Sequence, residues 1–300
     1  LKLNYNMSIG IYFLFFCSML AVSTSPLIAL YLDNQVSPIS IAFWRMLIGA
    51  LVLYAYSCSN KKIDSMGFDN FIKTLIAGVL LGFHFALFYG AIALLPNNAA
   101  NATVFGTLAP FFALFIEIYF GRKIDRKVYF GLVIILFGSF VMFMEEIDLY
   151  SNTMQGNILA ISCSVCFAIV FIISDQVRKT NSALSFSRSI FLYAAATLSI
   201  IAFFMDVNLL EVGVYENKFF LLFLGIVPTL IGHSVFYYLV KYLPPTVVAC
   251  IPLGEPFIFS MFTWFILPNS FVSQDINQYI IFGGLLTLVG LFIIVQSKKT

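Results

Sequence analysis

Charged residues are scarce in this chain: Asp, Glu, Lys and Arg make up 10% of its 300 residues, while 61% of the residues are hydrophobic. Soluble domains carry about 25% charged residues. The mean hydropathy of +0.98 is likewise typical of a chain whose surface meets lipid. No segment interleaves basic with aromatic residues as nucleic-acid-binding segments do. The composition therefore predicts an integral membrane protein and no nucleic-acid partner.

The sequence signatures of catalysis and metal binding are also missing. The sequence contains no His-Glu-x-x-His zinc pattern, no pair of intramembrane aspartates and no Gly-x-Ser-x-Gly turn. Cys163 and Cys166 share a helix face, but no further Cys or His is placed to complete a metal site, which favours small packing residues. The chain has no phosphate-cradling loop or ATP-binding domain, which excludes a primary pump. We expect no cofactor, no metal and no enzymatic activity, and keep an intramembrane enzyme as the least favoured alternative.

The apolar residues form ten stretches, each near the length of about 20 residues that crosses about 30 Å of hydrocarbon. They span 9–32, 37–57, 72–94, 98–119, 128–144, 156–174, 183–205, 219–240, 246–267 and 278–295. The connections between them are too short to hold a soluble domain. The sequence therefore predicts an all-α integral membrane fold with ten transmembrane helices.

The basic residues orient these helices. With the N-terminus inside, thirteen of the sixteen Lys and Arg residues lie in cytoplasmic segments. These are Lys2, Lys61, Lys62, Lys73, Arg122, Lys123, Arg126, Lys127, Arg178, Lys179, Lys241, Lys298 and Lys299. The opposite loops are acidic, as in the stretch from Glu145 to Asp148. An excess of Lys and Arg marks cytoplasmic loops, so both termini are expected in the cytoplasm.

The first apolar stretch resembles a secretory signal, because a charged start precedes it and Ala21-Val22-Ser23 lies within it. However, Met7–Gly10 matches Met154–Gly156 at the opening of the second half. We therefore expect this stretch to belong to the fold. Met7 offers another start besides Leu1, and the sequence leaves the true first residue open.

The two halves of the chain resemble one another. The segment from His84 to Pro96 returns as the segment from His233 to Pro244, and Tyr89 and Tyr237 occupy the same place in each. Matched positions lie about 150 residues apart, which is typical of an internal duplication. Because each half holds five spans, the second half is expected to be inverted relative to the first. We place the repeats at 1–149 and 150–300.

Several short motifs carry a family resemblance. They are Phe43-Trp44-Arg45, Ala102 through Pro110, Glu117, Gly121-Arg122-Lys123, Leu253-Gly254-Glu255-Pro256, and the glycines Gly138 and Gly290. In order and topology the chain resembles the EamA-type transporters of the drug/metabolite transporter superfamily over essentially its whole length. One departure is Leu267-Pro268-Asn269-Ser270, which lacks the second acidic residue and the glycine often found there.

The resemblance implies a multi-pass protein of the cell inner membrane that moves a small organic solute. We expect a secondary transporter for an amino acid or a related metabolite, working by alternating access and coupled to protons. Uptake or exchange of S-adenosylmethionine or a nucleotide-type metabolite is the alternative. The fold does not fix the solute, and the expected partners are that solute, protons and membrane lipid. The sequence leaves the direction of transport, the driving ion and the oligomeric state open.

The main candidate for the site is Glu255, about ten residues and so about 15 Å into its span, near the bilayer midplane. A carboxylate there costs about 2.5 kcal/mol or more, and such residues usually mark ion or solute paths. Pro252, Gly254 and Pro256 interrupt the helix around it, as Pro110 does in the fourth span. Paired helix breaks point to a central site. The alternatives are a structural glutamate and a kinked packing helix.

Two arginines and two histidines also lie within spans. Arg45 and Arg188 are each suited to bind a carboxylate or phosphate through the guanidinium fork, and the competing explanation is snorkelling to the interface. His84 and His233 are candidates to carry protons, and the competing explanation is a hydrogen bond that supports packing.

Trp44, Tyr89 and Tyr237 are candidates to stack on a planar or cationic solute. We expect a cavity between the halves, lined by spans three, four, eight and nine. Glu117 reads instead as an ion-pair partner of Arg122 or Lys123 at the cytoplasmic side.

Overall fold

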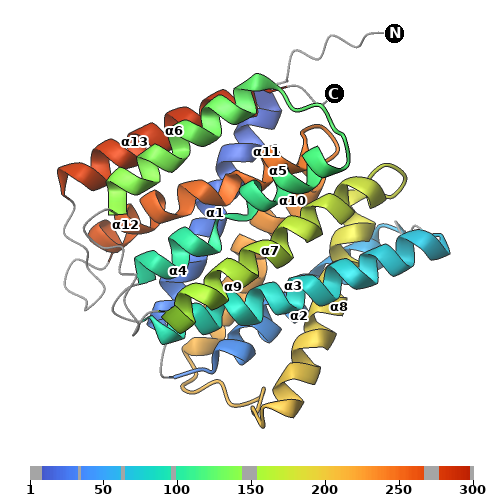
Figure 1. Cartoon of the computed structure of the whole chain (residues 1–300). Coiled ribbons are helices and arrows are strands. Elements are labelled where there is room, and N and C mark those ends of the chain that lie inside the picture. Colours follow the sequence, from blue (N-terminus) through green and yellow to red (C-terminus); the bar gives the residue numbers. More distant parts are fainter. Residues whose placement is uncertain are drawn as a thin grey trace.

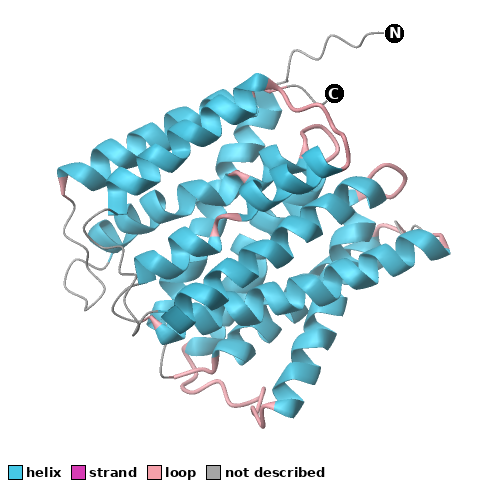
Figure 2. Cartoon of the chain, viewed as in Figure 1, coloured by secondary structure: helices cyan, strands magenta, loops and turns pink. Residues whose placement is uncertain are grey.

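The computed structural model describes residues 9–32, 35–61, 65–95, 99–143, 154–266 and 277–297. These residues form a bundle of helices joined by loops, without strands (Figures 1 and 2). The all-α class predicted from the composition is therefore confirmed.

The helices follow the predicted spans closely. In the first half they are α1 (Ile9–Tyr31), α2 (Pro38–Ser59), α3 (Phe68–Leu94), α4 (Ala99–Gly106), α5 (Ala109–Tyr119) and α6 (Arg126–Phe143). In the second half they are α7 (Met154–Val177), α8 (Ala183–Phe204), α9 (Asn217–Ile226), η1 (Val227–His233), α10 (Ser234–Leu239), α11 (Pro245–Ala249), η2 (Ile251–Gly254), α12 (Glu255–Ile266) and α13 (Gln278–Val295).

Nine helical stretches within the described ranges are long and apolar enough to cross a membrane. Eight stretches coincide with the predicted spans apart from shifts at their ends, and the stretch Asn217–Leu239 joins α9, η1 and α10 into the eighth span. The fifth predicted span coincides with helix α6, which is not among the nine. The predicted acidic connector at 145–153 lies outside the described residues.

Matching caps start the second helix of each half. Ser37 precedes α2, and its side-chain oxygen accepts a hydrogen bond from the Ser40 N–H at 3.1 Å. Ser182 precedes α8 and accepts from the Ser185 N–H, also at 3.1 Å. A serine at this position satisfies one of the N–H groups that the first helical turn leaves free. Local sequence therefore fixes where α2 and α8 begin.

Three of the spans that the structure describes are broken, which supports the helix breaks predicted from proline and glycine. The fourth span divides at Thr107 and Leu108, and Pro110 lies in the first turn of α5. The ninth span contains a short 3-10 turn, η2, and resumes as α12 at Glu255. The eighth span passes through a π-helical segment, η1, at Pro228, and we made no prediction of this break.

Helices of the two halves pack against each other rather than forming separate bodies. Helix α3 lies along α7 and α8, α2 along α8 and α9, and α1 against η1 and α12 (Figure 1). Helices α6 and α13 run side by side along one edge of the bundle (Figure 1). Their close approach requires glycine, because a Cβ on Gly138 would lie 2.6 Å from the Gly283 carbonyl oxygen. The two halves thus meet in a buried core.

Candidate functional site

A small cavity lies where the halves meet. Its lining residues are Val22, Ser25, Arg45, His84, Phe85, Phe88, Gly106, Thr107, Ala109, Phe167, His233, Pro252 and Glu255. The predicted spans three, four, eight and nine all contribute, but so do α1, α2 and α7, which the prediction left out. The cavity measures ≈ 20 Å³, about the space that one water molecule needs. In this conformation it is therefore closed around its polar groups.

Arg45 dominates the polar lining. Its side chain is buried, and its Nη1 donates to Ser25 Oγ at 2.6 Å and to Tyr89 OH at 2.7 Å. Its Nε donates to Thr229 Oγ1 at 3.0 Å. Helices α1, α3 and η1 thus hold the guanidinium from three sides. Snorkelling does not describe this arginine, because each of these partners is itself buried.

One edge of the Arg45 guanidinium is left free. Within the described part of the chain, Nη2 is buried and has no hydrogen-bond partner. The ring of Phe85 lies beneath the guanidinium, with its centroid 4.4 Å from the Cζ atom. A buried donor without a partner costs about 1 to 3 kcal/mol. The Nη2 group is therefore a ready donor for a water molecule or a solute in the cavity.

The two repeat-related histidines both reach the cavity. His84 Nδ1 lies 2.9 Å from the Cys163 carbonyl oxygen, and because a carbonyl only accepts, this nitrogen carries the hydrogen. His233 Nδ1 is buried and has no hydrogen-bond partner among the described residues. The packing explanation offered for an intramembrane histidine therefore fits His84, whereas His233 keeps an unused polar atom.

Glu255 lies at the first turn of α12, directly after η2, and lines the same cavity. Its close neighbour Gly254 lets α1 approach, because a Cβ there would lie 2.3 Å from the Met19 sulfur. Among the ion pairs of the described residues, none joins Glu255 to Arg45. The cavity thus brings together a basic and an acidic side chain from opposite halves that form no direct ion pair.

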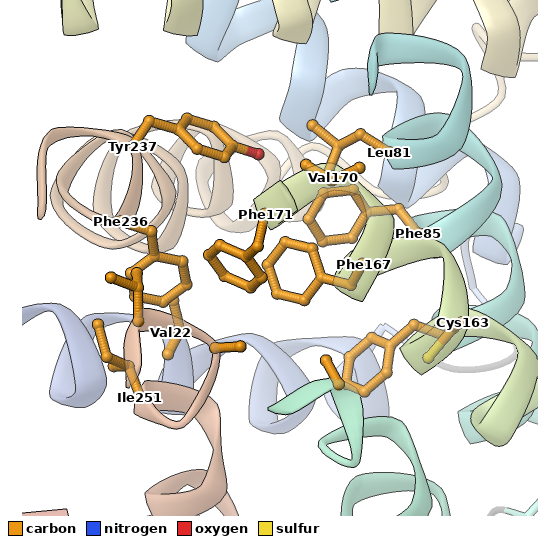
Figure 3. Close-up of a cluster of buried hydrophobic side chains, with 14 of the residues drawn as sticks. Val22, Leu81, Phe85, Cys163, Phe167, Val170, Phe171, Phe236, Tyr237 and Ile251 are labelled. Atoms are coloured by element: carbon orange, nitrogen blue, oxygen red, sulfur yellow. The ribbon is translucent and has the colours of Figure 1, made fainter. Parts of the chain in front are cut away.

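Phe85, Phe88 and Phe167 line the cavity, and Figure 3 shows Phe85 and Phe167 clustered with Phe171 and Phe236. The rings of Phe167 and Phe171 lie 4.4 Å apart, and Phe167 stacks on His84 at 4.3 Å between centroids. Such rings exclude water and present faces suited to apolar or cationic groups. The site therefore combines an apolar wall with a few fixed polar groups, as small-molecule sites do.

Four predicted solute-binding residues are absent from the cavity lining: Tyr237, Arg188, Trp44 and Tyr89. Tyr237 packs between the rings of Phe186 and Phe191, and its OH is buried without a hydrogen-bond partner among the described residues. The guanidinium of Arg188 lies over the ring of Tyr54, 5.4 Å from its centroid.

Trp44, the third of these residues, donates from Nε1 to the Leu209 carbonyl oxygen at 2.8 Å. That bond joins α2 to the connection before α9 instead of facing the cavity. Tyr89, in contrast, contacts the site through both Arg45 and Ser25.

Ser25 and Thr229 contact Arg45 directly, but they were not predicted as site residues. A serine inside an apolar helix gives no sequence signal of its own. Pro228 was the available signal for Thr229, because a proline frees a carbonyl within its helix.

A second polar network lies at the end of the bundle where α5 ends and α11 begins. Glu117 Oε2 accepts from the Thr246 N–H at 3.0 Å and from Thr246 Oγ1 at 2.5 Å, and Glu117 Oε1 accepts from Arg122 Nη1 at 3.1 Å. Arg122 also donates from Nη2 to Asp175 Oδ2 at 2.7 Å. The predicted ion pair of Glu117 with Arg122 is confirmed. The network ties α5 of the first half to α7 and α11 of the second.

This network borders two wider cavities, of ≈ 230 Å³ and ≈ 400 Å³. Arg122 is partly exposed to them, with 31% of its side-chain surface accessible. Burial alone lowers the pKa of Arg122, but the hydrogen bond and charge of Asp175, with those of Glu117, raise it above its usual value. The arginine therefore stays charged and keeps both carboxylates in place.

Comparison with known proteins gives matches over nearly the whole chain. A model of the EamA-like transporter family matches twice, at residues 9–144 and 154–296. A protein of Archaeoglobus fulgidus known as an uncharacterized transporter is 23% identical over 256 residues, covering 85% of this chain and 86% of that protein. A solved crystal structure, described only as that of a protein, superimposes with a TM-score of 0.75 at 17% identity, covering 95% of this chain and 96% of the other. The structural match shows the fold alone.

Proposed function

Because this chain belongs to the EamA-like transporter family, we propose that it is a secondary transporter of a small organic solute in the cell inner membrane. The solute is an amino acid or a related metabolite, and it crosses by alternating access. Ten spans form two inverted repeats, and both termini face the cytoplasm. The double family match and the segregation of basic residues to one side support this topology.

The observation that carries the proposal is that an arginine and a glutamate from opposite halves line one narrow cavity. Arg45 comes from the first half and Glu255 from the second, and Arg45 Nη2 has no hydrogen-bond partner among the described residues. Buried charges are expensive at membrane depth and usually belong to ion or solute paths. A zwitterionic solute would satisfy both groups, with its carboxylate on Arg45 and its amine on Glu255.

The aromatic wall supports the same class of solute. Phe85, Phe88 and Phe167 line the cavity beside the charged groups. An amino acid with an apolar side chain would place that side chain against the rings. The cavity of ≈ 20 Å³ is too small to admit it, so the halves must separate before binding.

Polar contacts close the site on both sides. The hydrogen bond from Trp44 to Leu209 joins the halves toward the outer end of the bundle, and the network around Glu117 and Arg122 joins them toward the cytoplasm. Rocking of the halves would open one set while the other holds. Glu255 would then meet each side in turn, and exchange of a proton on its carboxylate would couple solute movement to the proton gradient.

Counterflow in proteoliposomes tests the proposal. Vesicles are loaded with unlabelled amino acids, nucleotides or S-adenosylmethionine, and uptake of the matching labelled compound is followed. We expect counterflow with amino acids and recovery of the compound unchanged. Counterflow only with nucleotides or S-adenosylmethionine would replace the solute class, and chemical conversion of a compound would indicate an enzyme. The absence of flux with every class would contradict the proposal.

A further inference from the structure

Thr229 lies in η1, the π-helical segment of the second half, and its side chain is fully buried. The residue before it is Pro228, which has no N–H group. In an α-helix the N–H of residue 228 would bond to the carbonyl of Leu224. Thr229 Oγ1 donates to that carbonyl oxygen at 2.8 Å. The threonine hydroxyl thus replaces the hydrogen bond that the proline removes.

This bond fixes the direction of the hydroxyl. A hydroxyl has one hydrogen to donate and two lone pairs that accept. With its hydrogen committed to Leu224, Thr229 Oγ1 presents a lone pair to Arg45, whose Nε donates to it at 3.0 Å. The approach is close because a Cβ on Gly49 of α2 would lie 2.7 Å from the Thr229 Cγ2 atom. The glycine therefore brings the threonine within reach of the arginine.

The bond to Thr229 differs from the other hydrogen bonds of Arg45. Ser25 and Tyr89 belong to the same half as Arg45, whereas Thr229 belongs to the opposite half. Together the three partners use Nε and Nη1 and leave Nη2 as the free group. The orientation of the free edge therefore depends on how the second half sits against the first.

We infer that Thr229 is a positioning residue, which turns the free edge of Arg45 toward the cavity and ties the arginine to the position of the opposite half. This inference rests on the proposed function, because Arg45 is taken there as a solute ligand. Separation of the halves would break the Arg45–Thr229 bond, and closure around a bound solute would re-form it. The Thr229 hydroxyl thereby links the affinity for the solute to the opening of the halves.

Three variants test this inference. Thr229→Val keeps the branched shape but removes the hydroxyl, and Thr229→Ser restores it. The matched control is Thr197→Val in α8, because Thr197 Oγ1 also donates to a carbonyl of its own helix, that of Tyr193 at 2.9 Å. Thr197 lies outside the cavity lining, and in the described part of the chain it is not a hydrogen-bond partner of Arg45.

The first readout is counterflow with radiolabelled L-phenylalanine, or with the compound of the solute panel that the parent carries. Thr229→Val should raise KM about tenfold, the effect of one hydrogen bond to a charged group, with Vmax close to the parent value. Thr229→Ser and Thr197→Val should keep the parent KM. A general folding defect would instead lower Vmax by reducing the amount of active protein.

The second readout needs no solute. Val22 lines the cavity and faces Gly232 of η1, so Val22→Cys reports access between the halves. In purified protein, Thr229→Val should speed labelling of this cysteine by a small methanethiosulfonate, above the background from the native cysteines. Thr229→Ser and Thr197→Val should leave the labelling rate of this cysteine unchanged.

The two readouts separate failure of this inference from failure of the proposed function. If the parent carries no compound of the panel, the proposed function fails, and labelling still decides the role of Thr229. If Thr229→Val matches Thr197→Val in every readout obtained, the inference is wrong.

Discussion

Replacing Glu117 by Gln should weaken the polar network that holds α5 against α7 and α11, and so favour separation of these helices. The glutamine side chain has the same length and keeps one oxygen, which is able to accept from Thr246. Its amide, however, places a donor where Arg122 Nη1 now donates at 3.1 Å. The charge-assisted bond is therefore lost.

The magnitude follows from the geometry. A hydrogen bond to a charged group contributes about 1.5 to 3 kcal/mol. Arg122 is 31% exposed and keeps its bond to Asp175, so solvent and the second carboxylate reduce the loss to about 1 to 2 kcal/mol. A change of that size shifts an equilibrium about fivefold to thirtyfold.

Labelling of a single cysteine provides the assay for this shift. Ala113 lies one turn before Glu117 on α5 and is fully buried, so Ala113→Cys should react faster in the Glu117→Gln protein by about that factor. The matched control is Asp69→Asn, which removes the surface ion pair with Lys73. Exposed pairs of this kind contribute little. Equal labelling rates for parent and Glu117→Gln would refute the reasoning.

Three further predictions concern coupling, packing and topology. Glu255→Gln should preserve folding but abolish accumulation driven by a pH gradient; undiminished accumulation would make the residue structural. Gly138→Ala should lower thermal stability, by about 1 to 3 kcal/mol, because its Cβ would lie 2.6 Å from the Gly283 carbonyl oxygen. Gly67→Ala, with nothing within 4 Å, is the control, and equal melting curves would contradict the packing argument. Cysteines at 145–153 should react with impermeant reagents outside the cell; protection there, with reactivity at 122–127, would overturn the topology.

The sequence was informative where local chemistry decides the structure. Apolar length predicted the spans, and prolines predicted the breaks around Glu255 and before Pro110. The repeat indicated His84 and His233 as candidates, and both line the cavity. These features need no knowledge of which helices are neighbours.

The sequence was less informative where helix neighbours decide. Tyr89 and Tyr237 hold equivalent places in the repeat, yet Tyr89 bonds to Arg45 while the Tyr237 ring packs against Phe186. The surrounding side chains, rather than the repeat position, determine this difference. Ser25 is a similar case, since its role follows only from the meeting of α1 with α2.

The two arginines within spans, Arg45 and Arg188, give the most direct test of the central claim, that the cavity between the halves is the solute site. Lysine keeps the positive charge but loses the planar fork of arginine. In counterflow with radiolabelled L-phenylalanine, or the compound that the parent carries, Arg45→Lys should raise KM about tenfold or more. Arg188→Lys should leave KM near the parent value, because Arg188 lies over Tyr54 and outside the cavity lining. Equal effects of the two variants, or an effect of Arg188→Lys alone, would contradict the account.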